Sequence, residues 1–179
     1  MDALAEAITC RSAKADIVFL VDSSRSICGS DSTCENWRTI RQFVNRVIDQ
    51  MNIGDDAMRI GFIRYSSASE TSNEFYLNSY QSALGITTDV SGVQYQTGRS
   101  FIGNLATALS QARREQFTST RGDRIDAPNV IIVLTNGGFS PTGTIVSFQF
   151  LFIQLLVQMC TYVFSSVVHT LFCNIVAVF

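Results

Sequence analysis

The most constraining feature of the sequence is an apolar run that ends abruptly in polar residues. Ile17 to Val21 is an unbroken stretch of large and β-branched side chains, which is typical of a strand buried on both faces of a mostly parallel sheet. Asp22, Ser24 and Ser26 then place oxygen side chains at every second position. In open α/β sheets ligands bind just beyond the carboxyl ends of strands, and one carboxylate with two hydroxyls favours Mg²⁺, Mn²⁺ or Ca²⁺ over zinc. Taken alone, the triplet is also what a polar turn after a buried strand contains.

The pattern along the rest of the chain predicts alternating strands and helices. Apolar residues at helical spacing follow a capping box at Ser32 to Glu35 and predict a helix that ends near Gly54. A second continuous apolar run, at residues 129–134, predicts another buried strand. The further expected elements are a less uniformly buried strand at 58–65, a short antiparallel edge strand at 74–77, a weak helix at 79–90, a helix at 101–117 and the buried strand at 129–134. Together they predict an α/β fold with a doubly wound, mostly parallel sheet and one antiparallel edge strand.

Three polar segments at strand ends and helix starts, in this order, resemble a known family. They are the Asp-x-Ser-x-Ser triplet, the loop 98–103 and the segment 134–137. They resemble the metal-site loops of a von Willebrand factor type A domain of the extracellular matrix type, similar to the A domains of collagen VI. The resemblance covers about residues 15–139 and implies the Rossmann-like fold of that family, with its metal-ion-dependent adhesion site.

The resemblance also implies which residues hold the metal ion. They are Asp22, Ser24, Ser26, Ser100 and Asn136, where Ser100 stands at the position of the family's threonine ligand and Asn136 at that of its strand-end aspartate. The expected ion is Mg²⁺, or Mn²⁺ or Ca²⁺. Because charge count tunes affinity at oxygen sites, Asn136 predicts weak metal binding or none.

Cys28 and Cys34 flank a short polar loop, and they are two of the five cysteines. They close a small disulfide in an oxidising compartment, or they are two free thiols; the sequence leaves both interpretations open.

The charged residues end at Asp126, which divides the chain into an ordinary α/β part and an apolar tail. We expect an amino-terminal flank at 1–14, an incomplete type A domain at 15–143 and a tail at 144–179 in which the family's last strands and helices are missing or replaced. Three interpretations of the tail remain open: an alternative or non-native carboxyl end, a membrane anchor, or a divergent remainder of the fold that packs against the strand at 129–134.

The net charge of −2 gives no basic surface for nucleic acid. An enzyme is not expected, because the single histidine, His169, lies in the tail and no nucleophile elbow or phosphate loop is present. The resemblance implies a protein-binding adhesion module of an extracellular matrix or cell-surface protein, which engages a partner carboxylate through its metal ion and binds a matrix protein such as a collagen. The alternative is a truncated or membrane-tethered structural product without a working metal site. We expect an extracellular, secreted location, with the signal sequence absent from this chain.

Overall fold

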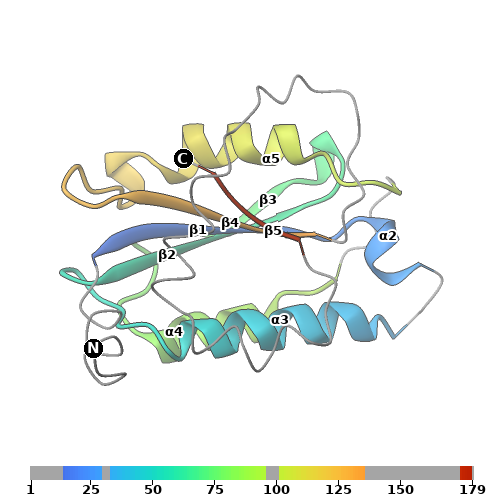
Figure 1. Cartoon of the computed structure of the whole chain (residues 1–179), viewed down its shortest axis with the longest axis horizontal. Coiled ribbons are helices and arrows are strands. Elements are labelled where there is room, and N and C mark those ends of the chain that lie inside the picture. The colour runs from blue at the N-terminus through green and yellow to red at the C-terminus, as the bar shows by residue number, and fades with distance from the viewer. Residues whose placement is uncertain (1–13, 30–32, 96–100, 136–173, 179) are drawn as a thin grey trace, which may run out of the picture.

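The computed structural model describes residues 14–29, 33–95, 101–135 and 174–178. In this part of the chain a five-stranded sheet of order β3-β2-β1-β4-β5 lies between layers of helices (Figure 1). The strands are β1 (Ala15–Asp22), β2 (Met58–Tyr65), β3 (Ser72–Phe75), β4 (Asn129–Thr135) and β5 (Asn174–Val178). The three central strands are parallel, whereas β3 and β5 run antiparallel to their neighbours. The predicted α/β class, the mostly parallel sheet and the antiparallel edge strand β3 are confirmed.

The central strand β1 is buried along its whole length, as its continuous apolar run predicts. Successive side chains of a strand point to opposite faces, and each face of β1 contributes to a different hydrophobic cluster. Ile17, Phe19 and Val21 pack on one face, and Val18 and Leu20 pack on the other. The sheet therefore needs helices on both sides.

Four α-helices accompany the sheet in the described residues: α2 (Arg25–Cys28), α3 (Glu35–Ile48), α4 (Ala83–Gly92) and α5 (Leu105–Gln111). Helices α3 and α4 cover one face and α5 covers the other (Figure 1). The buried residues of α3 repeat at helical spacing; they are Trp37, Ile40, Val44, Val47 and Ile48. These α3 side chains pack in the same hydrophobic cluster as Ile17, Phe19 and Val21 of β1.

The start of α3 and the burial of β2 differ from prediction. The residue that precedes α3 is Cys34, not Ser32, and its φ of 46° lies in the left-handed region, so the helix begins immediately after it. Ser32 itself lies outside the described residues. Strand β2 is buried at every position except the half-buried Arg59, because β1 and β3 flank it and helices cover both faces of the sheet.

Three other elements begin at different residues from those expected. Strand β3 lies two residues before the predicted 74–77. Helix α4 begins after Ser82, whose hydroxyl accepts a hydrogen bond from the Gly85 N–H. Helix α5 begins after Asn104, whose side chain accepts from the Thr107 N–H at 3.0 Å, rather than at 101, and a π-helical turn, Ala112–Gln116, follows it.

The apolar tail contributes β5, which pairs with β4 along its free edge. Residues 136–173 lie outside the described part, so the three interpretations of the tail stay predictions. Among the described residues no helix is long and apolar enough to cross a membrane.

The amino end of β1 is held by an ion pair between Asp16 and Arg124. Asp16 is fully buried, and its carboxylate accepts from the backbone N–H of Arg124 at 2.7 Å and from the guanidinium Nε at 2.9 Å. The same guanidinium donates through Nη2 to the carbonyl oxygens of Ala15 and Ala57. One arginine therefore neutralises the buried carboxylate and ties the starts of β1 and β2 together.

Candidate metal centre

The candidate site lies at the carboxyl end of β1, where Asp22 is the last residue of the strand. In the parallel register Asp22 pairs with Tyr65, the last residue of β2. On the other side Val21 pairs with Leu134, which brings Thr135 at the end of β4 beside Asp22. Three polar side chains from three adjacent strands therefore meet at one edge of the sheet, and all three are buried.

The Asp22 carboxylate accepts hydrogen bonds from neutral groups. Its Oδ1 accepts from the backbone N–H of Ser24 at 2.8 Å, and its Oδ2 accepts from the Thr135 hydroxyl at 3.0 Å. None of the ion pairs within the described residues includes Asp22. The carboxylate is thus oriented without a positive partner from that part of the chain.

Burial raises the pKa of Asp22 above its ordinary value, and the hydrogen bonds from Ser24 and Thr135 lower it less than burial raises it. The ionised form is therefore costly in the folded protein. A bound cation would remove that cost, since opposite charge favours the ionised carboxylate.

Two serine hydroxyls stand next to this carboxylate. The Oγ atoms of Ser24 and Ser26 lie 3.0 Å apart. Ser24 caps the short helix α2 without using its side chain in a capping bond. Ser23, between Asp22 and Ser24, donates its hydroxyl to the Tyr65 carbonyl oxygen instead. The turn from the end of β1 into α2 thus brings the hydroxyls of Ser24 and Ser26 together, while Ser23 faces β2.

The segment before α5 closes against the same edge. The carbonyl oxygen of Phe101 accepts from the Ser26 N–H at 3.0 Å, and the N–H of Asn104 donates to the Ser66 carbonyl oxygen at 2.6 Å. Between them Gly103 comes so close that a Cβ there would lie 2.8 Å from the Tyr65 ring and 2.9 Å from Asp22 Oδ1. Only glycine lets the backbone approach the carboxylate this closely.

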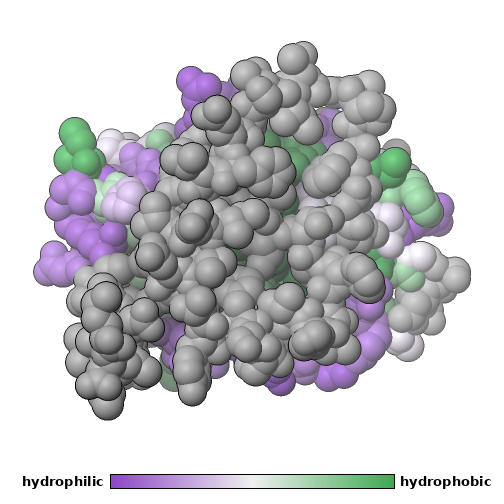
Figure 2. Space-filling model, in the orientation of Figure 1, coloured by the Kyte–Doolittle hydropathy of each residue, from purple (hydrophilic) through white to green (hydrophobic). Residues whose placement is uncertain are grey.

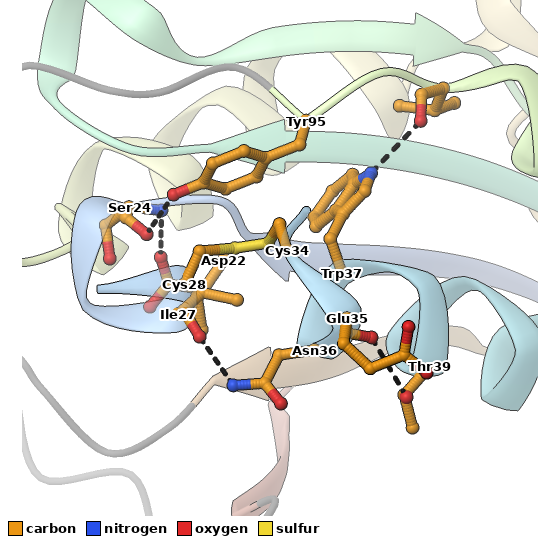
Figure 3. The surroundings of a disulfide bond; sticks show 11 residues. Asp22, Ser24, Ile27, Cys28, Cys34, Glu35, Asn36, Trp37, Thr39 and Tyr95 are labelled. Atoms are coloured by element: carbon orange, nitrogen blue, oxygen red, sulfur yellow. Dashed lines mark hydrogen bonds between the residues drawn. A yellow bond between two sulfur atoms is a disulfide. The ribbon is translucent and has the colours of Figure 1, made fainter. Parts of the chain in front are cut away.

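Two tyrosines border the site. The Tyr95 hydroxyl donates to the Ser24 carbonyl oxygen at 3.2 Å (Figure 3). The Tyr65 hydroxyl is buried at the same edge. Burial raises the pKa of both tyrosines, and the negative charge of Asp22 raises each further. Both phenols therefore remain protonated beside the carboxylate.

A disulfide joins Cys28 at the end of α2 to Cys34 at the start of α3 (Figure 3). Their Cα atoms are 5.0 Å apart, which is within the ordinary range for such a bond. Trp37 and Tyr95 pack beside it with ring centroids 5.8 Å apart. This cluster fixes the short helix that carries Ser26.

The structure brings together three of the five predicted metal ligands: Asp22, Ser24 and Ser26. Ser100 and Asn136 lie outside the described residues, and their roles stay predictions. Of their described neighbours in the sequence, Phe101 is hydrogen-bonded to Ser26 and Thr135 to Asp22.

Sequence reasoning missed Tyr65 and Tyr95 at this edge, since their positions depend on contacts between segments distant in the sequence. It included Gly103 and Thr135 in the loop 98–103 and the segment 134–137, but gave neither residue a role of its own.

The donor set fits a hard divalent ion better than a soft one. Asp22 supplies a carboxylate, and Ser24 and Ser26 supply adjacent hydroxyl oxygens. Within the described residues no three histidine, cysteine or acidic side chains gather in a metal-binding group. Hydroxyl oxygens would therefore have to complete the coordination begun by one carboxylate.

The family model for the von Willebrand factor type A domain matches residues 16–147. The chain belongs to this family. It is 33% identical over 128 residues to the collagen alpha-4(VI) chain of Mus musculus, and 31% identical over 131 residues to matrilin-1 of Gallus gallus. Each match covers 72% of this chain, but only 5% of the collagen chain and 24% of matrilin-1. The type A chain thus spans a quarter or less of these relatives.

Solved structures show the same type A fold. Proximal thread matrix protein 1 from the mussel byssus superposes with a TM-score of 0.65 at 22% identity, over 74% of this chain and 33% of that one. A further structure of that protein, with zinc in its metal-ion-dependent adhesion site, has a TM-score of 0.65 at 20% identity over the same shares.

Proposed function

We propose that this type A domain is a protein-binding adhesion module of the extracellular matrix, and that its site engages a partner carboxylate through a divalent ion. The observation that carries the proposal is the buried Asp22 carboxylate, which is oriented by neutral donors beside the Ser24–Ser26 hydroxyl pair. The family membership and the matrix relatives support it.

Asp22, Ser24 and Ser26 would hold the ion, with Ser100 and Asn136 as the further ligands. We expect Mg²⁺, or Mn²⁺ or Ca²⁺, because all of these side chains are oxygen donors. When bound, the ion supplies an electrophilic position that accepts a carboxylate from another protein. The protein's own part is to orient Asp22 through Ser24 and Thr135, and to keep the serine hydroxyls together.

The proposed partner is an extracellular matrix protein such as a collagen, and the proposed location is extracellular and secreted. The matrix relatives and the Cys28–Cys34 disulfide support this location. We propose no catalytic activity. Turnover of a phosphatase substrate by the purified chain would contradict the proposal that it has no catalytic activity.

The alternative is a truncated or membrane-tethered structural product without a working metal site. Asn136 favours it, because a neutral amide leaves Asp22 as the one carboxylate in the proposed ligand set. Burial raises the pKa of Asp22, so a metal ion must compete with a proton that the carboxylate binds more tightly than usual.

Calorimetric titration with Mg²⁺ and Mn²⁺ separates the two candidates. We expect weak binding by the full chain, tighter binding by Asn136→Asp and none by Asp22→Asn. Asn52→Asp is the matched control, because it adds the same charge at an exposed position near the amino end of β2. No binding by either the natural chain or Asn136→Asp would contradict the metal site.

Partner binding is measured on surfaces coated with purified collagens, in Mg²⁺ and in EDTA. Retention in Mg²⁺ and release by EDTA are expected. Retention unaffected by EDTA would favour the alternative.

A further inference from the structure

Two exposed side chains of different chemistry border the Ser24–Ser26 pair. Arg25 lies between the serines in the sequence and is exposed. Phe101 lies on the opposing segment and is 64% exposed. Apolar surface is visible at this end of the molecule, where α2 and the segment entering α5 lie (Figure 2).

Phe101 is held in place although its ring contributes little to the core. Its carbonyl oxygen accepts from the Ser26 N–H at 3.0 Å, so its backbone is fixed directly beside a proposed ligand. Only two other large apolar side chains in the described residues are as exposed, Leu84 and Ile125. Neither is hydrogen-bonded to the site. An exposed aromatic ring on an anchored backbone offers a large apolar contact area with few rotatable bonds to order.

Arg25 supplies positive charge on the same edge. None of the ion pairs in the described part of the chain includes it. It is the first residue of α2, directly between the N-cap Ser24 and Ser26, so its positive charge is carried on the same turn as the serine pair.

We propose that Arg25 and Phe101 select the sequence around the partner's carboxylate: the partner is an acidic protein segment that carries a second carboxylate for Arg25 and a large apolar side chain for Phe101. This inference rests on the proposed function, which supplies the first carboxylate contact. Charge complementarity favours an acidic segment, and arginine and aromatic residues are the side chains enriched at the centres of protein interfaces.

Four synthetic peptides test the inference with the full chain immobilised on a sensor. The first contains Gly-Leu-Glu-Asp-Gly, the second replaces Leu by Ser, the third replaces Asp by Asn, and the fourth replaces both acidic residues by amides. Presentation on streptavidin makes weak contacts measurable through avidity. Binding is measured in Mg²⁺ and in EDTA.

The natural chain should prefer the first peptide over the second and over the third by about threefold to tenfold each. Phe101→Ser should abolish the preference for Leu and leave binding of the second peptide unchanged. Arg25→Gln should abolish the preference for Asp and leave the preference for Leu. The matched controls are Ile125→Ser and Arg113→Gln, which change exposed side chains elsewhere and should alter neither preference.

The inference and the proposed function fail in different ways. Preferences that survive Phe101→Ser and Arg25→Gln, with binding that EDTA abolishes, would overturn this inference alone. If EDTA leaves binding intact but the variants remove the preferences, the roles of Arg25 and Phe101 would be supported. The metal-dependent contact of the proposed function would then be contradicted. A failure of all four peptides to bind would overturn both.

Discussion

The two ends of β1 each bury an aspartate, but the fold treats the two carboxylates differently. Asp16 and Asp22 are both fully buried on the same strand. Asp16 receives the guanidinium of Arg124 at 2.7 Å, so its charge is neutralised within the fold. Asp22 is held by neutral donors, among them the Ser24 N–H and the Thr135 hydroxyl, and its pKa is raised by burial. The comparison teaches that the fold supplies a counter-charge at one end of the strand, whereas at the other end no ion pair in the described residues includes the buried carboxylate.

The largest expected effect is at the stabilising end. Arg124→Ala should lower the free energy of unfolding by about 3–5 kcal/mol, because it leaves Asp16 buried without its counter-charge. Urea denaturation measures it, with Arg113→Ala as the control at an exposed arginine. A loss similar to that of the control would show that the two ends do not differ as described.

A smaller loss is expected where the backbone approaches the site. Gly103→Ala should cost about 1–3 kcal/mol, since its Cβ would meet the Tyr65 ring and Asp22 at 2.8 and 2.9 Å. It should also weaken Mg²⁺ binding by displacing the carboxylate. Gly54→Ala, where nothing lies within 4 Å of the added carbon, is the matched control for both measurements. Unchanged metal affinity in Gly103→Ala would remove this segment from the site.

Asp22→Asn sharpens the comparison, because its effect on stability should be opposite to that of Arg124→Ala. Without metal, the free energy of unfolding should be unchanged or higher by on the order of 1 kcal/mol, since a costly buried charge is removed. Mg²⁺ should no longer stabilise the variant. Urea denaturation with and without Mg²⁺ measures both effects. A large loss in the metal-free protein would mean that Asp22 is structural, like Asp16.

The smallest effect expected is a pH dependence that only Asp22 produces. The pKa of Asp22 in the folded state lies above its unfolded value of about 3.9. In the pH window between these two pKa values, the folded state therefore binds the proton more tightly than the unfolded state does. The metal-free natural chain should therefore gain stability relative to Asp22→Asn as pH falls through the window. The stabilisation by Mg²⁺ should disappear over the same range. Urea midpoints measured across the window test this, and two parallel pH curves would contradict it.

The sequence predicted the elements that depend on local pattern. The apolar runs of β1 and β4 and the helical spacing of α3 identify the parallel sheet and its covering helix. The first turn of the expected helix at 101 was wrong because Phe101 and Asn104 use their backbone groups to bind Ser26 and Ser66. That competition is invisible in a hydrophobic pattern.

The same limit applies to the two aspartates. Asp16 begins the apolar run and Asp22 ends it, and the local sequence marks Asp22 as a candidate ligand but does not show that only Asp16 has a counter-charge. The distinction arises from Arg124, which is 108 residues from Asp16, and from Thr135, which is 113 residues from Asp22. Asp22, Ser24 and Ser26 were predictable because their spacing is local, whereas the neighbours that set their charge are not.

The bond between Cys28 and Cys34 has a consequence for where the molecule matures. It links the helix that carries Ser26 to the helix that covers one face of the sheet. A cell compartment that keeps thiols reduced would leave the helix that carries Ser26 without its covalent link to α3. The proposed metal site would then have this support only in an oxidising environment.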